Sequence, residues 1–360
     1  MLRKLFILIP ILGILIAIIS FQSNSQKENI VLEFIKKHPQ RSAIKIVRNK
    51  DIIANVNSNK IMPLASTVKI IIAIEYAIQA ANSLINPDEK IHISELEKFH
   101  VKNTDGGSHS KWLEKSKSKI INNKISIREI TKGMIRYSSN ANTEWLCHRL
   151  GLKNINRRLK ELGIQKHTEI YYMVSSLFVG KELFPNTIGT KLKNKLKNLP
   201  LKKYINATHS IHNKLLLDST YKKNKGDLRI NIQKVRSDNL PSSTVSEYTE
   251  LMNKLNSKSY LSKKTHSYLD EALESLMKNP KNQKWLQHAG TKGGSTAFVF
   301  TNIFYATDKK GNTTEVVYFF NNLTPSERKE LTKTHNAFIL KILTNKEFRA
   351  KISNELSSIN

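Results

Sequence analysis

The sequence contains only one cysteine, Cys147, among its 360 residues, so an internal disulfide is excluded. It also has no Cys/His spacing typical of zinc sites, no Arg-rich block and no aromatic RNA-binding signature. Acidic residues are scarce, with 29 Asp and Glu against 59 Lys and Arg, which gives a formal net charge of +30. Because the Lys residues are spread along the whole chain, this charge favours anionic envelope polymers or a membrane surface over nucleic acid as a partner.

Residues 1–25 have the layout of an export signal. Arg3 and Lys4 precede the uncharged apolar stretch 5–19, and polar residues follow it. The segment lacks the Ala-x-Ala of a typical cleavage site and the cysteine of a lipoprotein anchor. A cleaved signal peptide and a retained N-terminal membrane anchor both remain open, and in either case we expect the rest of the chain to be extracytoplasmic.

Hydrophobic patterns at the two ends of the chain predict strands, and those in the middle predict helices. Alternation over residues 42–57 predicts a β-hairpin, and two further strands are expected near 297–307 and 315–321, followed by a helix over 326–343. We therefore expect an α+β fold, an α/β/α sandwich whose antiparallel sheet combines residues of about 30–75 and 285–345 with flanking helices.

An all-helical lobe of about residues 76–284 is expected to be inserted into this sheet lobe. Within it, the Lys- and Asn-rich residues of about 180–240 have few apolar positions and predict a basic surface insertion. The domain would run over 26–345, with 346–360 as a C-terminal tail.

Ser66 and Lys69 lie three residues apart at the start of an apolar run that predicts a buried helix. Residues at this spacing share a helix face, and a desolvated Lys amine there could remove the proton of the Ser hydroxyl. The same spacing recurs elsewhere, as in Ser326 and Lys329, but without the apolar run. The alternative is that Ser66 only caps the helix while Lys69 extends to the surface.

Two more short segments carry polar groups at structural boundaries. Ser138-Ser139-Asn140 follows a predicted helix that opens at Ser126, and Lys292-Gly293-Gly294 precedes the predicted strand at 297–307. By themselves, the first segment could be helix caps and the second a glycine bulge that enters a strand.

The chain resembles the penicillin-recognising serine enzymes, which are the class A β-lactamases and the DD-peptidases (penicillin-binding proteins). The resemblance lies in three motifs that occur in the same order, namely Ser66-x-x-Lys69, Ser138-x-Asn140 and Lys292-Gly-Gly294. The resemblance extends over most of residues 30–345. It implies a β-lactamase/transpeptidase-like fold, an acyl-enzyme mechanism, no cofactor, and a β-lactam or peptidoglycan-derived substrate.

The resemblance also implies catalytic roles. Ser66 would be the nucleophile, Lys69 would help to remove its proton, and Ser138 would pass a proton to the leaving nitrogen. Lys292 would attract the carboxylate of the substrate.

Four other residues would bind the substrate. Asn140 would hold its amide side chain, and Ser295 would donate a backbone N–H, together with that of Ser66, to the oxyanion. Gly293 and Gly294 would let the backbone approach the substrate closely.

Two departures from the family pattern bear on activity. Gly293 replaces the usual Thr or Ser after the motif lysine, and no Glu-x-x-Leu-Asn stretch follows the second motif. Glu169 is the only nearby carboxylate and thus the possible deacylation base. Without a positioned base, the acyl-enzyme would persist for minutes or longer.

Three activities follow as alternatives: a β-lactamase, a D-Ala-D-Ala peptidase or related esterase or amidase acting on cell-wall material, and a catalytically silent basic envelope-binding protein. No His, Cys or carboxylate cluster has metal-site spacing, and His109 is expected to be a solvated loop residue.

Overall fold

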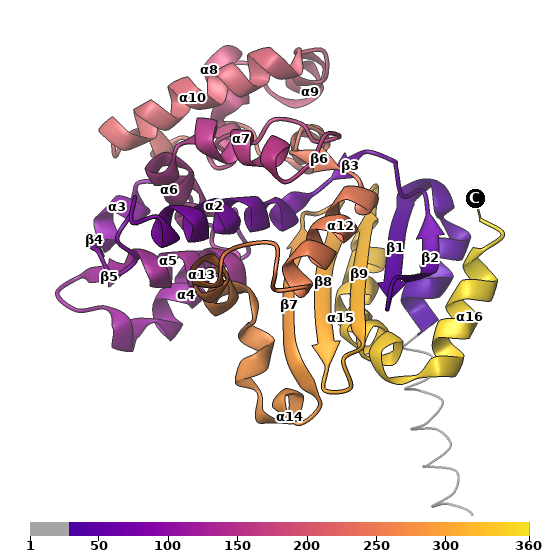
Figure 1. Cartoon of the computed structure of the whole chain (residues 1–360). Coiled ribbons are helices and arrows are strands. Elements are labelled where there is room, and N and C mark those ends of the chain that lie inside the picture. The colour runs from indigo at the N-terminus through magenta and orange to yellow at the C-terminus, as the bar shows by residue number, and fades with distance from the viewer. Residues whose placement is uncertain (1–28, 360) are drawn as a thin grey trace, which may run out of the picture.

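The computed structural model describes residues 29–359, so the expected signal or anchor at 1–25 lies outside the described residues. Its centre is a five-stranded antiparallel sheet with the strand order β2-β1-β9-β8-β7 (Figure 1). The strands are β1 (Ser42–Arg48), β2 (Asp51–Val56), β7 (Leu286–Ser295), β8 (Phe300–Asp308) and β9 (Thr313–Phe320). The sheet therefore joins the two terminal parts of the chain, which confirms the predicted α+β fold.

The hairpin β1–β2 turns at Asn49 and Lys50, both with positive φ, as a tight hairpin turn requires. β8 and β9 lie inside the sheet and are buried along almost their whole length. The apolar runs 303–306 in β8 and 316–320 in β9 reflect this burial on both faces.

The third C-terminal strand differs from the prediction. The Lys292-Gly293-Gly294 segment was expected at the start of a strand, but it lies near the end of β7, which pairs with β8 and forms one edge of the sheet. Three glycines in ten residues weaken the strand pattern in the sequence, so only the pairing with β8 reveals β7.

Terminal helices cover one face of the sheet. They are the helical residues 29–37, α15 (Pro325–Thr344) and α16 (Lys346–Leu356), and their apolar side chains share a core with β1, β8 and β9. The segment 346–360, expected as a tail, thus contains a helix that buries Phe348, Ile352 and Leu356 against the sheet. On the opposite face, α12 (Val245–Asn256) packs on β8 and β9, although its sequence position suggested the helical lobe.

The helical lobe surrounds α2 (Lys69–Ala81), nearly all of whose residues are buried. Its further helices are α3 (Ile93–Glu97), α4 (Ser108–Lys115), α5 (Ile127–Arg136), α6 (Asn140–Leu150), α7 (Leu152–Glu161) and α13 (Lys263–Leu273). The short helix α14 (Pro280–Gln283) lies beside β7 instead (Figure 1). Two short strand pairs join segments of the lobe, namely β3 (Met62–Pro63) with β6 (Ser242–Ser243) and β4 (Lys90–His92) with β5 (Lys124–Ser126). Because α2 has apolar residues on all sides, it can form the centre of this lobe.

The basic segment 180–240 folds into helices that extend the lobe at the top of Figure 1. They are α8 (Val179–Leu183), α9 (Gly189–Lys197), α10 (Leu201–Leu217) and α11 (Ile230–Asp238). Tyr204, Ile211 and Leu215 on α10 join the main core of the lobe. The insertion is thus a packed subdomain, and the apolar residues that hold it are few but regularly spaced along α10.

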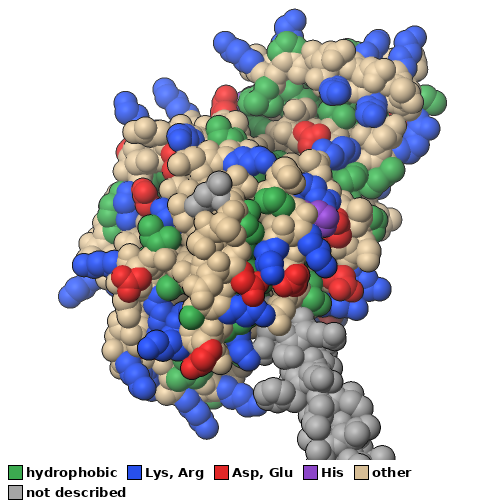
Figure 2. Space-filling model, turned by 90° about the vertical axis from the view of Figure 1, so that its right-hand side faces the viewer, with side chains coloured by type: hydrophobic (Ala, Val, Ile, Leu, Met, Phe, Trp, Pro, Cys, Tyr) green, Lys and Arg blue, Asp and Glu red, His purple; other side chains and the backbone are tan. Residues whose placement is uncertain are grey.

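Lys and Arg side chains are scattered over the face shown in Figure 2, with Asp and Glu among them. This agrees with the diffuse charge of the sequence. Across residues 29–359, every helix is too short or too polar to cross a membrane.

Candidate active site

Ser66 lies in a 3-10 turn, Ala65–Val68, that leads directly into α2. The N-cap residue of α2 is Val68, and no side chain caps the helix, so the alternative that Ser66 serves as its cap is wrong. Ala65 has a φ of 47°, a conformation that is unfavourable for a residue with a Cβ and often found at functional sites. Among the described residues, the Ser66 hydroxyl has no hydrogen-bond partner, and it lines a cleft.

Lys69 is 1% exposed, so it does not extend to the surface. Its Nζ donates hydrogen bonds to Ser138 O at 2.8 Å and to Asn140 Oδ1 at 2.7 Å, and it lies 3.3 Å from Ser138 Oγ. Burial lowers the pKa of Lys69 well below its usual value, and the neighbouring charge of Lys292 lowers it further. Both effects favour the neutral form of the amine.

Ser138 sits at the break between α5 and α6 with a φ of 66°. The capping role belongs to its neighbour Ser139, whose Oγ accepts a hydrogen bond from Asn142 N at the start of α6. The cap thus explains Ser139 only, and it leaves Ser138 and Asn140 turned toward Lys69.

Lys292 approaches Ser138 from the sheet. Its Nζ donates to Ser138 Oγ at 3.2 Å and to Gly293 O at 2.6 Å. The side chain is 4% exposed, and burial lowers its pKa to about 7. Ser138 is consequently shared between two lysines, one from α2 and one from β7.

The two glycines after Lys292 differ in their surroundings. A Cβ on Gly294 would lie 2.5 Å from Ser66 N, 2.6 Å from Thr301 Oγ1 and 2.8 Å from Leu64 O, whereas a Cβ on Gly293 would come no closer than 3.5 Å to Asn302. Gly294 is therefore what lets the edge strand pass directly against the backbone of Ser66.

The cleft beside Ser66 has a volume of about 550 Å³. It brings together six of the residues predicted from the sequence: Ser66, Ser138, Asn140, Gly293, Gly294 and Ser295. Lys69 and Lys292 join them through their bonds to Ser138.

Several lining residues were not predicted, among them Asp105, Gln233, Arg236, Arg328 and His335. They come from loops and helices far apart in the sequence and belong to no motif, so nothing in the sequence identified them. Their side chains make this part of the cleft polar and give it two guanidinium groups.

Glu169 is not part of this arrangement, since its side chain is exposed and it does not line the cleft. The carboxylate that does line it is Asp105, whose two oxygens accept the backbone N–H groups of Gly107 and His109. Glu144 on α6 is buried, but its oxygens accept bonds from Val174 N, Ser175 N and Ser175 Oγ. Each carboxylate near the cleft thus holds backbone in place.

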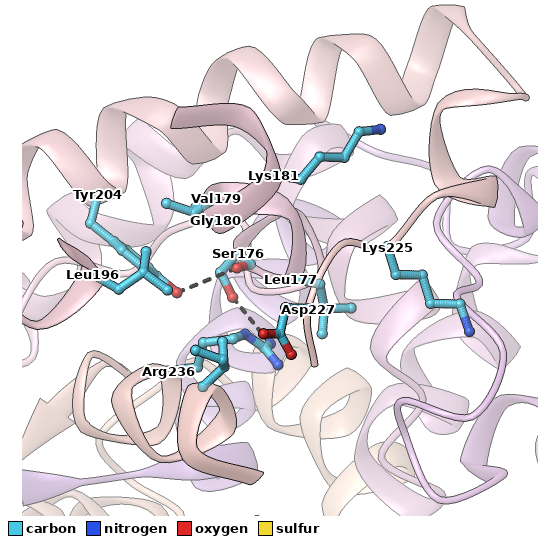
Figure 3. A pocket seen from close by; sticks show the side chains of 11 residues that line it. Ser176, Leu177, Val179, Gly180, Lys181, Leu196, Tyr204, Lys225, Asp227 and Arg236 are labelled. Carbon is cyan, nitrogen blue, oxygen red and sulfur yellow. Dashed lines mark hydrogen bonds between the residues drawn. The ribbon is translucent and has the colours of Figure 1, made fainter. Parts of the chain in front are cut away.

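Arg236 lines both the cleft and a small cavity of about 10 Å³, which is shown in Figure 3. In this cavity its guanidinium donates to Ser176 Oγ at 3.4 Å, and Tyr204 OH donates to Ser176 O at 3.4 Å. Arg236 belongs to the inserted helix α11, as do Gln233 and Ser237, which also line the cleft, so the insertion forms part of the cleft lining.

A profile described as the Beta-lactamase enzyme family matches residues 26–281. The chain belongs to this family of β-lactamase-like serine hydrolases. No curated protein matches the sequence. The family assignment agrees with the three motifs and with the cleft in which they meet.

Solved structures share the β-lactamase/transpeptidase-like fold. A β-lactamase from Chitinophaga pinensis has a TM-score of 0.52 at 15% identity, covering 94% of this chain and 100% of that chain. A β-lactamase from Burkholderia vietnamiensis has a TM-score of 0.55 at 12% identity, covering 89% and 97%. A mutant of PBP-A, solved as an acyl-enzyme complex with penicillin G, has a TM-score of 0.51 at 13% identity, with coverage of 89% and 97%.

Proposed function

We propose that the protein is an exported serine hydrolase that is acylated at Ser66 by β-lactams or related amides and is deacylated slowly. The observation that carries this proposal is the hydrogen-bonded group of Lys69, Ser138 and Lys292 beside the free hydroxyl of Ser66. Such a group provides a base, a proton donor and a positive charge around one nucleophile.

Acylation begins with proton transfer from Ser66 Oγ to Lys69 Nζ as Oγ attacks the carbonyl carbon. A neutral amine has two N–H groups, and Lys69 can give both to Ser138 O and Asn140 Oδ1, which leaves its lone pair for the Ser66 hydroxyl. As the carbon–nitrogen bond breaks, Ser138 passes its proton to the leaving nitrogen and recovers one from the lysines that contact it.

Substrate binding uses the edge strand and Lys292. The backbone N–H groups of Ser66 and Ser295 would stabilise the oxyanion, because Gly294 brings β7 directly against Ser66. In its charged form, Lys292 would attract the carboxylate of the substrate. Asn140, which faces the same cleft, would bind the amide side chain of the substrate.

Slow deacylation is expected from the positions and hydrogen bonds of the carboxylates near the cleft. Asp105 is committed to two backbone N–H groups, Glu144 holds the segment at residues 174–175, and Glu169 is exposed. Asp105 is the one carboxylate among the described residues that line the cleft, and because its oxygens already hold backbone N–H groups it is a poor base for a water that attacks the acyl group. This favours a penicillin-binding activity of the DD-peptidase or esterase type over rapid β-lactam hydrolysis.

The proposed location is outside the cytoplasm, on the basis of the apolar N-terminal stretch with Arg3 and Lys4. A peptidoglycan-derived substrate would be accessible there. The excess of positive charge would also attract the chain to anionic polymers of the envelope.

Intact-mass measurement after incubation with a penicillin, and separately with a fluorophosphonate, tests the proposal. We expect one adduct per chain in the wild type and none in Ser66→Ala. Ser326→Ala is the matched control, because Ser326 and Lys329 repeat the same spacing on the exposed start of α15.

The penicillin adduct should persist for minutes or longer. Its rapid loss, together with accumulation of an adduct in Glu169→Ala, would instead favour a β-lactamase that uses Glu169. The absence of any adduct with either probe would favour a catalytically silent binding protein.

A further inference from the structure

Three potential metal ligands meet beside the helix break that carries Ser138. They are Glu97 at the end of α3, His100 just after it, and His109 in α4, and one ligand atom from each lies within 4.8 Å of the other two. Glu97 Oε1 is 3.0 Å from His109 Nε2, and Glu97 Oε2 is 3.1 Å from His100 Nδ1. The sequence spacing gave no sign of this cluster, and His109, expected in a solvated loop, is fully buried.

Hydrogen bonds around Ser139 fix the tautomer of His109. Asn142 Nδ2 donates to Ile130 O at 3.0 Å, so the amide oxygen of Asn142 is the atom that faces Ser139 Oγ. The Ser139 hydroxyl donates its only proton to that oxygen at 3.0 Å. Ser139 Oγ can then only accept from His109 Nδ1, which lies 2.8 Å away.

His109 therefore carries a proton on Nδ1, and its neutral form has a lone pair on Nε2. This lone pair faces a carboxylate oxygen of Glu97 at 3.0 Å. Two acceptors at this distance repel each other, so either a proton or a metal ion must lie between them.

We propose that Glu97, His100 and His109 bind one divalent transition-metal ion, for which zinc has the best chemistry. Two imidazole nitrogens and one carboxylate oxygen are a common zinc ligand set, and three protein ligands leave a fourth position for water. The Glu97 side chain is 39% exposed, whereas that of His109 is fully buried, so an ion could enter from the Glu97 side.

The bond from His109 Nδ1–H to Ser139 provides the outer support that such sites need. Metal-bound histidines commonly donate their other N–H to a neighbouring acceptor, which holds the ring in the binding orientation. Here the acceptor belongs to the chain itself and is already hydrogen-bonded to Asn142.

The position of the site gives it a role for the cleft. Ser139 lies between Ser138 and Asn140, both of which line the cleft, and Asp105 and Ser108 in the segment before His109 line it as well. A bound ion would link the segment before His109 and α3 to the break between α5 and α6. It would thereby stabilise one rim of the cleft.

The inserted subdomain reaches the same place. Lys222, in the connection between α10 and α11, donates to the backbone carbonyl of Glu97. Its amine thus bonds the main chain of Glu97, while the two carboxylate oxygens of Glu97 face His100 and His109. The carboxylate therefore stays directed at the position of the ion.

The test uses the full chain without an affinity tag, stripped of metal with a chelator. Zinc affinity is measured by competition with a chromophoric chelator, and Co²⁺ is used as a spectroscopic probe of four-coordinate geometry. We compare the wild type with His100→Ala and Glu97→Gln, both at partly exposed positions, so that folding is preserved and is verified by circular dichroism. His38→Ala is the control, since His38 pairs with Glu327 on α15, outside the cluster.

We expect one zinc ion per chain, and affinity reduced about tenfold or more in His100→Ala and Glu97→Gln but unchanged in His38→Ala. Co²⁺ should give visible bands of a four-coordinate site in the wild type only. Equal affinity in the wild type and His100→Ala, or no stoichiometric binding, would overturn the proposal and leave a proton, not a metal ion, between His109 and Glu97. Because acylation of Ser66 is measured separately, its failure would leave the zinc result unaffected.

Discussion

Replacing Gly294 by Ala probes the closest approach in the active site, that of β7 to the nucleophile. The added Cβ would lie 2.5 Å from Ser66 N and 2.8 Å from Leu64 O, both backbone atoms, and 2.6 Å from Thr301 Oγ1. Backbone atoms cannot rotate away, so the strand or the turn before α2 must move. We expect the substitution to impair both stability and acylation.

The size of each effect follows from these contacts. Overpacking of this kind costs about 1–3 kcal/mol in the free energy of unfolding. If the shift moves Ser66 N–H away from the oxyanion, the acylation rate should fall by about 100-fold or more, as for the loss of one oxyanion donor. The contact with Thr301 Oγ1 should be relieved more easily than those with the two backbone atoms, because the Thr301 side chain can change rotamer.

Urea unfolding and the initial rate of labelling by a fluorescent penicillin measure the two effects. Gly293→Ala is the matched control for stability, since its Cβ would make only ordinary contacts, the nearest at 3.5 Å. Wild-type stability and labelling in Gly294→Ala, or an equal loss of stability in Gly293→Ala, would refute the assigned proximity of β7 and Ser66.

Three further predictions concern other parts of the molecule. The rate of acylation by a penicillin that bears a carboxylate should fall as the pH rises above about 7, because Lys292 loses its charge there. The rate with a neutral fluorophosphonate should show no such fall. A parallel decline of both rates would contradict this role of Lys292. Glu169→Ala should leave the lifetime of the penicillin adduct unchanged by intact mass, since the side chain is exposed, and a longer lifetime would reinstate it as the base. Phe348→Ala should lower the free energy of unfolding, measured in urea, by about 3–5 kcal/mol, because the ring is buried against the sheet. A decrease of less than about 0.5 kcal/mol would show that α16 contributes little to stability.

Local sequence patterns were sufficient to predict those helices and strands whose own residues form a distinctive pattern. The hairpin β1–β2 alternates around a turn, α2 is apolar on every side, and Ser126 accepts a hydrogen bond from Glu129 N as an N-cap. The three motifs also placed Ser66, Ser138 and Lys292 in one cleft, because their order along the chain matches a known family.

Features that depend on contacts between segments far apart in the sequence were not predicted. β7 contains three glycines and becomes a strand by pairing with β8. The sequence of α16 is mostly polar, and its few apolar side chains become core residues through contacts with β2 and α15. The cluster of Glu97, His100 and His109 needs α4 to fold back on the end of α3, which no local pattern encodes. The hydrogen bonds of Lys69 to Ser138 and Asn140 likewise depend on the packing of α2 against α6.

The most direct test of the account is the site and lifetime of the penicillin adduct. Intact mass over time, followed by peptide mapping, should show a single modification on the peptide that contains Ser66, persisting for minutes or longer and absent from Ser66→Ala. An adduct that survives Ser66→Ala, or a chain that remains unmodified by both the penicillin and the fluorophosphonate, would contradict the assignment of Ser66 as the nucleophile.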